Sequence, residues 1–281
     1  MKRLALFAIP LIFAVGSIRA TPAPKASHAT QSQDSTSEFS DTPPMTPRQV
    51  AEMRAGILMA RKDYAEAALA FQRILEGDPQ NAALLNSTGM AYQQLGQDQL
   101  AEHFYKKAVS AQKNFSRAIN NLGTLEYSAG HYGKAIKYYK KAISRTDLKA
   151  SEGDLAPIYS NLGYAYCGIK EYPHAMDAFA KALAIDPSVF DHKGTSGSIL
   201  QQRSAPDPAA LYFLLAKSYA KTGDVEHAAH YLKLARDDGY KDILAAQTDP
   251  DFARVIKAPQ VQDVLRVTPA YAAQPGKTVS N

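Results

Sequence analysis

A few segments of the sequence contain the residue types that bind phosphate, and their spacing decides whether they can do so. Residues 276–278 (GKT) match the end of a phosphate-binding loop, but the position five residues before them is Tyr271 rather than glycine. Residues 194–198 (GTSGS) offer backbone N–H groups to an anion, but no strand precedes them. We expect a flexible loop there and no phosphate site in either segment.

Other reactive side chains are also present without the neighbours they need. His227 and His230 share a face of one helix, but spacing fixes no third metal ligand beside them. Cys167 is the only cysteine, and the sequence indicates no histidine and acid to activate it. Asp249 and Asp251 are better explained by helix capping than by general acid catalysis. We therefore predict no catalytic residue, no metal site and no cofactor, and hence a protein that is not an enzyme.

The elements that would position any site are helical hairpins. Residues 120–145 have apolar residues at helical spacing on both sides of a turn, which predicts two short helices. Gly123 has a counterpart at Gly89 and Tyr139 has one at Tyr105, each 34 residues earlier. One hairpin cannot bury its apolar face alone, so repeated copies predict a stack.

This pattern resembles the tetratricopeptide repeat family, in which small residues stand at the eighth and twentieth positions of a 34-residue helix-turn-helix. The small residues where two helices would cross are Gly89, Gly123 and Gly163, with Ala55 and Gly56 sharing the role in the first repeat. Glycines at the position of a left-handed helix C-cap are Gly96, Gly130 and Gly223. Aspartates that precede proline and are expected to cap helices are Asp78, Asp186 and Asp207.

The resemblance implies an all-α, right-handed α-solenoid of about five hairpins with a C-terminal helical cap. We predict a signal peptide at 1–20, a disordered linker at 21–46, a solenoid at 47–265 and a disordered tail at 266–281. The expected repeats are 48–81, 82–115, 116–149, 156–189 and 209–242, followed by a cap of two short helices at 243–265. An insert, 150–155, should extend the preceding helix or form a loop, and 190–208 departs from the repeat pattern.

Residues 1–20 resemble a secretory signal peptide, with basic residues at Lys2 and Arg3, an apolar run and a small residue at Ala20. An uncleaved anchor is the alternative. After removal of the signal we expect no transmembrane span and a periplasmic or secreted protein. Residues 21–281 carry 29 basic and 27 acidic residues, so the charge gives little support to nucleic-acid binding.

In this family the first helices of the hairpins line a concave groove where peptides or helices dock. The resemblance therefore implies a protein or peptide partner that contacts Asn86, Arg117, Asn120, Asn121, Tyr127, Asn161 and Tyr164. Asparagine can donate to and accept from a peptide main chain, and tyrosine adds apolar area with a polar tip. The alternative is that Asn121 and Asn161 cap or cross-link neighbouring helices.

A second surface is basic. Lysines on the second helices of repeats two and three form what we call the basic face: Lys106, Lys107, Lys134, Lys137, Lys140 and Lys141, together with Arg145. It fits anionic lipid or an acidic envelope polymer, although a solvated surface also explains it.

Taken together, the sequence predicts a non-catalytic scaffold or adaptor in the bacterial cell envelope. A carbohydrate- or envelope-polymer-binding accessory protein that uses Tyr127, Tyr164 and the basic face is the alternative. An enzyme acting through residues 190–208 is a third hypothesis.

Overall fold

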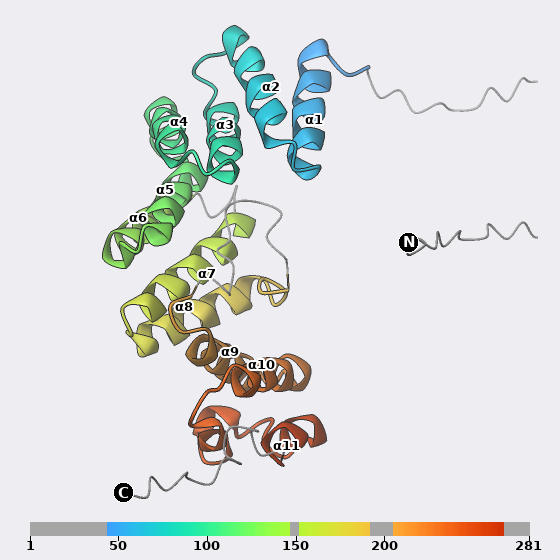
Figure 1. Ribbon diagram of the computed structural model, residues 1–281, viewed down its shortest axis with the longest axis vertical. Helices are drawn as coiled ribbons and strands as arrows, with labels where there is room; N and C mark the ends of the chain where they lie inside the picture. The colour runs from blue at the N-terminus through green and yellow to red at the C-terminus, as the bar shows by residue number, and fades with distance from the viewer. Residues whose placement is uncertain (1–43, 147–151, 192–204, 267–281) are drawn as a thin grey trace, which may run out of the picture. The chain divides into compact units, whose positions relative to one another are not determined.

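The computed structural model describes residues 44–146, 152–191 and 205–266, and in these ranges all regular secondary structure is helical. The first ten helices form five consecutive hairpins (Figure 1). They are α1 (Pro47–Ala60) with α2 (Tyr64–Gly77), α3 (Ala82–Gln94) with α4 (Asp98–Ala111), α5 (Ser116–Ser128) with α6 (Tyr132–Arg145), α7 (Glu152–Gly168) with α8 (Tyr172–Ile185), and α9 (Pro208–Thr222) with α10 (Val225–Asp237). The second helix of each hairpin packs against the first helix of the next. The predicted all-α stack is confirmed.

Close crossing of the two helices in a hairpin depends on a missing side chain. A Cβ atom on Gly163 would lie 2.3 Å from Cε1 of Phe179, and one on Gly123 would lie 2.5 Å from Cε1 of Tyr139. Both rings are fully buried, so they have little room to move. In the first hairpin Ala55 is buried, whereas a Cβ atom added to Gly56 would have no neighbour within 4 Å. Ala55 alone is therefore the small residue at the helix crossing, a role that we had divided between Ala55 and Gly56.

The turn inside each hairpin uses the left-handed backbone conformation. Gly96, Gly130 and Gly223 have φ values of 70°, 77° and 87°, which confirms the predicted C-caps. In the first and fourth hairpins Lys62 and Lys170 adopt the same conformation, with φ values of 66° and 60°. The turn is therefore dictated by the repeat geometry even where the residue is not glycine.

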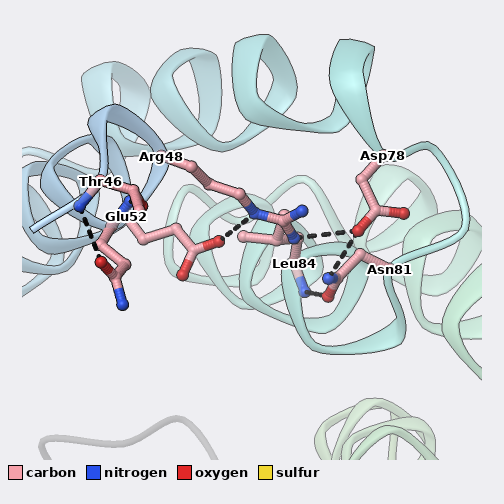
Figure 2. A network of polar contacts seen from close by, with 7 residues as sticks. Thr46, Arg48, Glu52, Asp78, Asn81 and Leu84 are labelled. Atoms are coloured by element: carbon pink, nitrogen blue, oxygen red, sulfur yellow. Dashed lines mark hydrogen bonds and ion pairs between the residues drawn. The ribbon is translucent and has the colours of Figure 1, made fainter.

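Only one of the three predicted aspartate caps is correct. Asp207 caps α9, accepting from the N–H of Ala210 at 3.0 Å. Asp186 instead closes a turn by accepting from the N–H of Ser188. Figure 2 shows the third case: Asn81 caps α3, and Asp78 accepts from the Asn81 amide and from Arg48.

The C-terminal cap differs from the two predicted helices. Two short 3₁₀ segments, η2 (Ile243–Gln247) and η3 (Pro250–Phe252), precede one α-helix, α11 (Pro259–Arg266). Asp249 caps η3 by accepting from the N–H of Asp251, as expected of a capping residue. Lys217 on α9 forms ion pairs with both carboxylates, at 2.7 and 3.3 Å, which ties the cap to the last hairpin.

The insert before the fourth hairpin behaves differently from either expectation. α6 ends at Arg145, and α7 already begins at Glu152, so the end of the insert extends the following helix. The predicted signal peptide, most of the linker and of 190–208, and all of the tail except Arg266 lie outside the described residues. Among the described helices, none combines the length and the apolar character needed to cross a membrane.

Candidate functional site

The predicted groove asparagines form a chain of hydrogen bonds across three hairpins. Asn161 of α7 donates through Nδ2 to Oδ1 of Asn120 on α5 at 3.0 Å. Asn120 donates to its neighbour Asn121 at 3.4 Å, and Asn121 donates to Oδ1 of Asn86 on α3 at 2.9 Å. We call these four residues the amide ladder. It joins the first helices of three successive hairpins.

Burial decides what the amide ladder can contact. Asn86 is 5% exposed, Asn120 1%, and Asn121 and Asn161 are fully buried. A buried amide is expected to be hydrogen-bonded, because leaving it unpaired costs about 1–3 kcal/mol. Of the two interpretations left open by the sequence, these contacts support the cross-link between helices. Direct contact of these asparagines with a partner stays a prediction.

The two predicted groove tyrosines lie in the protein interior. Tyr127 packs edge-on against Tyr132, with ring centroids 5.1 Å apart. Tyr164 packs edge-on against Phe179 at 5.6 Å, and burial raises the pKa of its hydroxyl well above the usual range. Neither ring is more than 3% exposed, so neither offers a free face on which a sugar can stack.

Arg117 is the one predicted groove residue whose side chain is largely in solvent. Its side chain is 58% exposed, and its Nε lies 2.9 Å from each carboxylate oxygen of Asp154 on α7. Asp154 was missed by sequence reasoning, because we assigned residues 150–155 to an insert and not to the first helix of the fourth hairpin. Its position only two residues before a helix pattern that starts at 156 is the signal that could have found it.

The basic face is exposed along α4 and α6, as predicted for these lysines. Lys106 pairs with Glu102 at 2.6 Å and Lys134 approaches Glu126 at 3.6 Å. In the described part of the chain Lys137 and Lys141 have no ion-pair partner. α6 itself contains five basic residues and no acidic one, so this helix carries uncompensated positive charge.

The remaining reactive side chains have structural explanations. Burial, and then the charge of Asp207, raises the pKa of the Cys167 thiol to about 12, which is the opposite of what a nucleophile needs. His227 is held between two carboxylates, with Nδ1 2.7 Å from Asp224 and Nε2 3.2 Å from Asp191. No group of three or more histidine, cysteine or acidic side chains is arranged to hold a metal ion in residues 44–146, 152–191 and 205–266.

His227 makes stability depend on pH. Partial burial lowers its pKa, but the hydrogen bond and charge of Asp224 and the charge of Asp191 outweigh burial, so the pKa is raised above 6.5. A raised folded-state pKa stabilises the fold below the unfolded value, and this stabilisation is lost as pH rises through the folded value. We expect His227→Gln to cost roughly 0.5–1 kcal/mol at about pH 5.5 and much less at about pH 8.5.

Urea unfolding at both pH values measures this effect, and His230→Gln is the matched control. His230 is exposed on the same helix and has no ion pair among the described residues. An equal cost of His227→Gln at both pH values would contradict the assignment.

Comparisons with known proteins agree with this geometry. Models of the tetratricopeptide repeat match residues 53–117, 115–188 and 209–235. The type IV pilus assembly protein PilF of Pseudomonas aeruginosa is 28% identical over 138 residues, which are 47% of this chain and 52% of PilF. SPINDLY of Hordeum vulgare, a probable UDP-N-acetylglucosamine–peptide N-acetylglucosaminyltransferase, is 29% identical over 140 residues, which are 47% of this chain and 14% of SPINDLY.

Among solved structures, the widely conserved type IV pilus biogenesis factor PilW is similar with a TM-score of 0.50. The match has 17% sequence identity and covers 79% of this chain and 100% of that one, and at this identity it shows the fold alone. The chain spans about half the length of PilF and far less of SPINDLY.

Proposed function

Because the chain belongs to the tetratricopeptide repeat family, whose members act as protein-interaction scaffolds, we propose that it is a non-catalytic scaffold of the bacterial cell envelope. It binds a protein or peptide segment along the first helices of its hairpins. The partner contacts the side chains at the border of the amide ladder, among them Arg117, whose side chain is 58% exposed.

The amide ladder is the observation that carries this proposal. Its hydrogen bonds fix α3, α5 and α7 relative to one another before any partner arrives. A surface that is ordered in advance loses less conformational entropy on binding, which favours affinity. The Arg117–Asp154 pair extends this cross-link to the solvent-exposed border and presents charge and hydrogen-bonding groups there.

The envelope setting rests on two supports. Residues 1–20 have the basic start and apolar run of a signal peptide. PilF, one of the similar proteins, is named as a type IV pilus assembly protein. Periplasmic or secreted location is part of the proposal.

A second candidate partner is an anionic envelope polymer bound to the basic face. The uncompensated charge of α6 favours it, because Lys137 and Lys141 lack ion-pair partners in the part of the chain that the structure describes. An acidic polymer would gain from these cations, and its binding would weaken at high salt. An enzyme acting through residues 190–208 remains only a hypothesis.

Site-specific photocrosslinking distinguishes the two surfaces. A benzophenone amino acid is placed at Met90 or Arg117, beside the amide ladder, and at Lys141 on the basic face. Each variant is expressed in the protein's own host cells in place of the native chain. We expect protein adducts from the variants at Met90 and Arg117 and none from the variant at Lys141. Adducts from Lys141 alone, lost at high salt, would favour the basic face, and the absence of adducts at all three would contradict the scaffold.

A further inference from the structure

The first hairpin has an open face between its two helices. A groove of about 480 Å³ runs between α1 and α2. Its floor is apolar and consists of Val50 and Ala51 from α1 with Ala70 and Ile74 from α2, all half-buried. We call it the terminal groove, because it lies on the first hairpin of the stack.

The repeat shows what normally covers this face. The residues that follow Val50, Ala51 and Arg54 by 34 positions are Leu84, Leu85 and Thr88. Those three residues are 6%, 3% and 0% exposed, and α2 of the preceding hairpin packs on their helix. No helix precedes α1 in the described residues. The terminal groove is therefore a face that this fold elsewhere covers with a helix.

Charge on the rim of the groove selects the kind of helix. Arg48 is already neutralised, since it pairs with Glu52 at 2.8 Å and with Asp78 at 2.9 Å, as Figure 2 shows. Arg54 on α1 and Arg73 on α2 are exposed and line the groove from its two sides. Neither has an ion pair with any residue that the structure describes, so the rim keeps two free positive charges.

We propose that the terminal groove docks an acidic amphipathic helix of a partner protein. Its apolar residues lie on the groove floor, and its aspartates or glutamates face Arg54 and Arg73. α2 gives the pattern of the apolar stripe, because its buried residues in the cluster that contains Leu84 and Leu85 are Ala67, Ala68, Phe71 and Leu75. α1 has 14 residues, so a docked helix of about four turns fits its length of about 21 Å. This surface is separate from the border of the amide ladder.

A designed peptide tests the proposal. The probe is a fluorescein-labelled helical peptide of about 14 residues that repeats the apolar stripe of α2 and carries glutamates on both flanks. A matched peptide has lysines in place of the glutamates. We expect the acidic peptide to bind the full chain, measured by fluorescence anisotropy, and the lysine peptide to bind at least about tenfold more weakly.

Charge reversal then locates the site. Arg54→Glu with Arg73→Glu should weaken the acidic peptide about tenfold or more and improve the lysine peptide. Lys107→Glu with Lys137→Glu makes the same change of net charge on α4 and α6 and should leave the acidic peptide bound. All four side chains are exposed, and an unchanged far-UV circular dichroism spectrum verifies folding.

Three results would overturn the proposal. The first is equal binding, or no binding, of the two peptides. The second is loss of the acidic peptide in the Lys107 and Lys137 variant alone, which would assign it to the basic face. The third is concentration-dependent self-association that Arg54→Glu with Arg73→Glu abolishes, which would make a second copy of the chain the occupant.

Discussion

Gly163→Ala is expected to destabilise the fourth hairpin by about 2–3 kcal/mol. The new methyl carbon would lie 2.3 Å from Cε1 and 2.5 Å from Cδ1 of Phe179, well inside van der Waals contact. Phe179 is fully buried and packs against Tyr164 and Phe190, so its ring cannot move aside without disturbing both neighbours. The helices must separate, and urea unfolding followed by circular dichroism measures the cost.

Gly56→Ala is the matched control. Gly56 lies inside α1, is exposed, and a Cβ there meets nothing within 4 Å. The same substitution should therefore stabilise the protein by about 0.5–1 kcal/mol, because alanine has the higher helix propensity. Opposite signs at the two glycines are the expected result.

A second substitution tests the cause of the Gly163 effect. Phe179→Leu removes the ring atoms that the new methyl group would meet. The cost of Gly163→Ala should therefore be smaller in the Phe179→Leu background than in the native one. Strict additivity of the two substitutions would show that crowding against the ring is not the reason.

Asn121→Ala is expected to cost about 2–3 kcal/mol, because it removes the centre of the amide ladder. The substitution leaves Oδ1 of Asn86 without its donor and Nδ2 of Asn120 without the Asn121 acceptor, both in the protein interior. Asn114→Ala is the control, since Asn114 is exposed and its side chain accepts a hydrogen bond from Arg145 at 3.2 Å. It should change the stability by less than about 0.5 kcal/mol.

The double variant separates the hydrogen bond from other effects. Asn86→Ala with Asn121→Ala removes both partners of the 2.9 Å contact, so the Asn86 amide is no longer left buried without its donor. We expect it to cost about 1 kcal/mol less than the sum of the single substitutions. If the double variant costs as much as the two single substitutions added together, the 2.9 Å hydrogen bond between Asn121 and Asn86 makes no specific contribution to stability.

These stability effects change how binding has to be tested. Loss of a partner after Asn121→Ala or Asn161→Ala is ambiguous, because a loosened stack would also lose it. Substitutions of exposed residues avoid this problem. Arg117 is suitable for the inner border, Lys141 for the basic face, and Arg54 with Arg73 for the terminal groove.

The sequence alone determined the hairpins and their stacking. Small and aromatic residues recur 34 positions apart because a small residue must face an aromatic ring at each helix crossing, as Gly123 faces Tyr139. Both residues belong to the same hairpin, so their spacing in the sequence predicts this contact directly. The left-handed turns followed from Gly96, Gly130 and Gly223 for the same reason. Local rules were weaker at Asp78, where capping of α3 passed to Asn81 while the carboxylate paired with Arg48, 30 residues away.

Only the tertiary structure decided which polar residues are available. Asn86, Asn121 and Asn161 stand at positions that the resemblance to the repeat family assigns to an inner face, but a position within a repeat does not report how closely neighbouring hairpins approach. Packing brings these amides within hydrogen-bonding distance of one another and removes them from solvent. The same stacking leaves Val50, Ala51 and Arg54 uncovered, because α1 has no preceding helix in the described chain. The exposure of a side chain depends on the residues packed against it from the neighbouring hairpin or from another molecule. Those residues are far away in the sequence or outside it, so a local pattern does not report them.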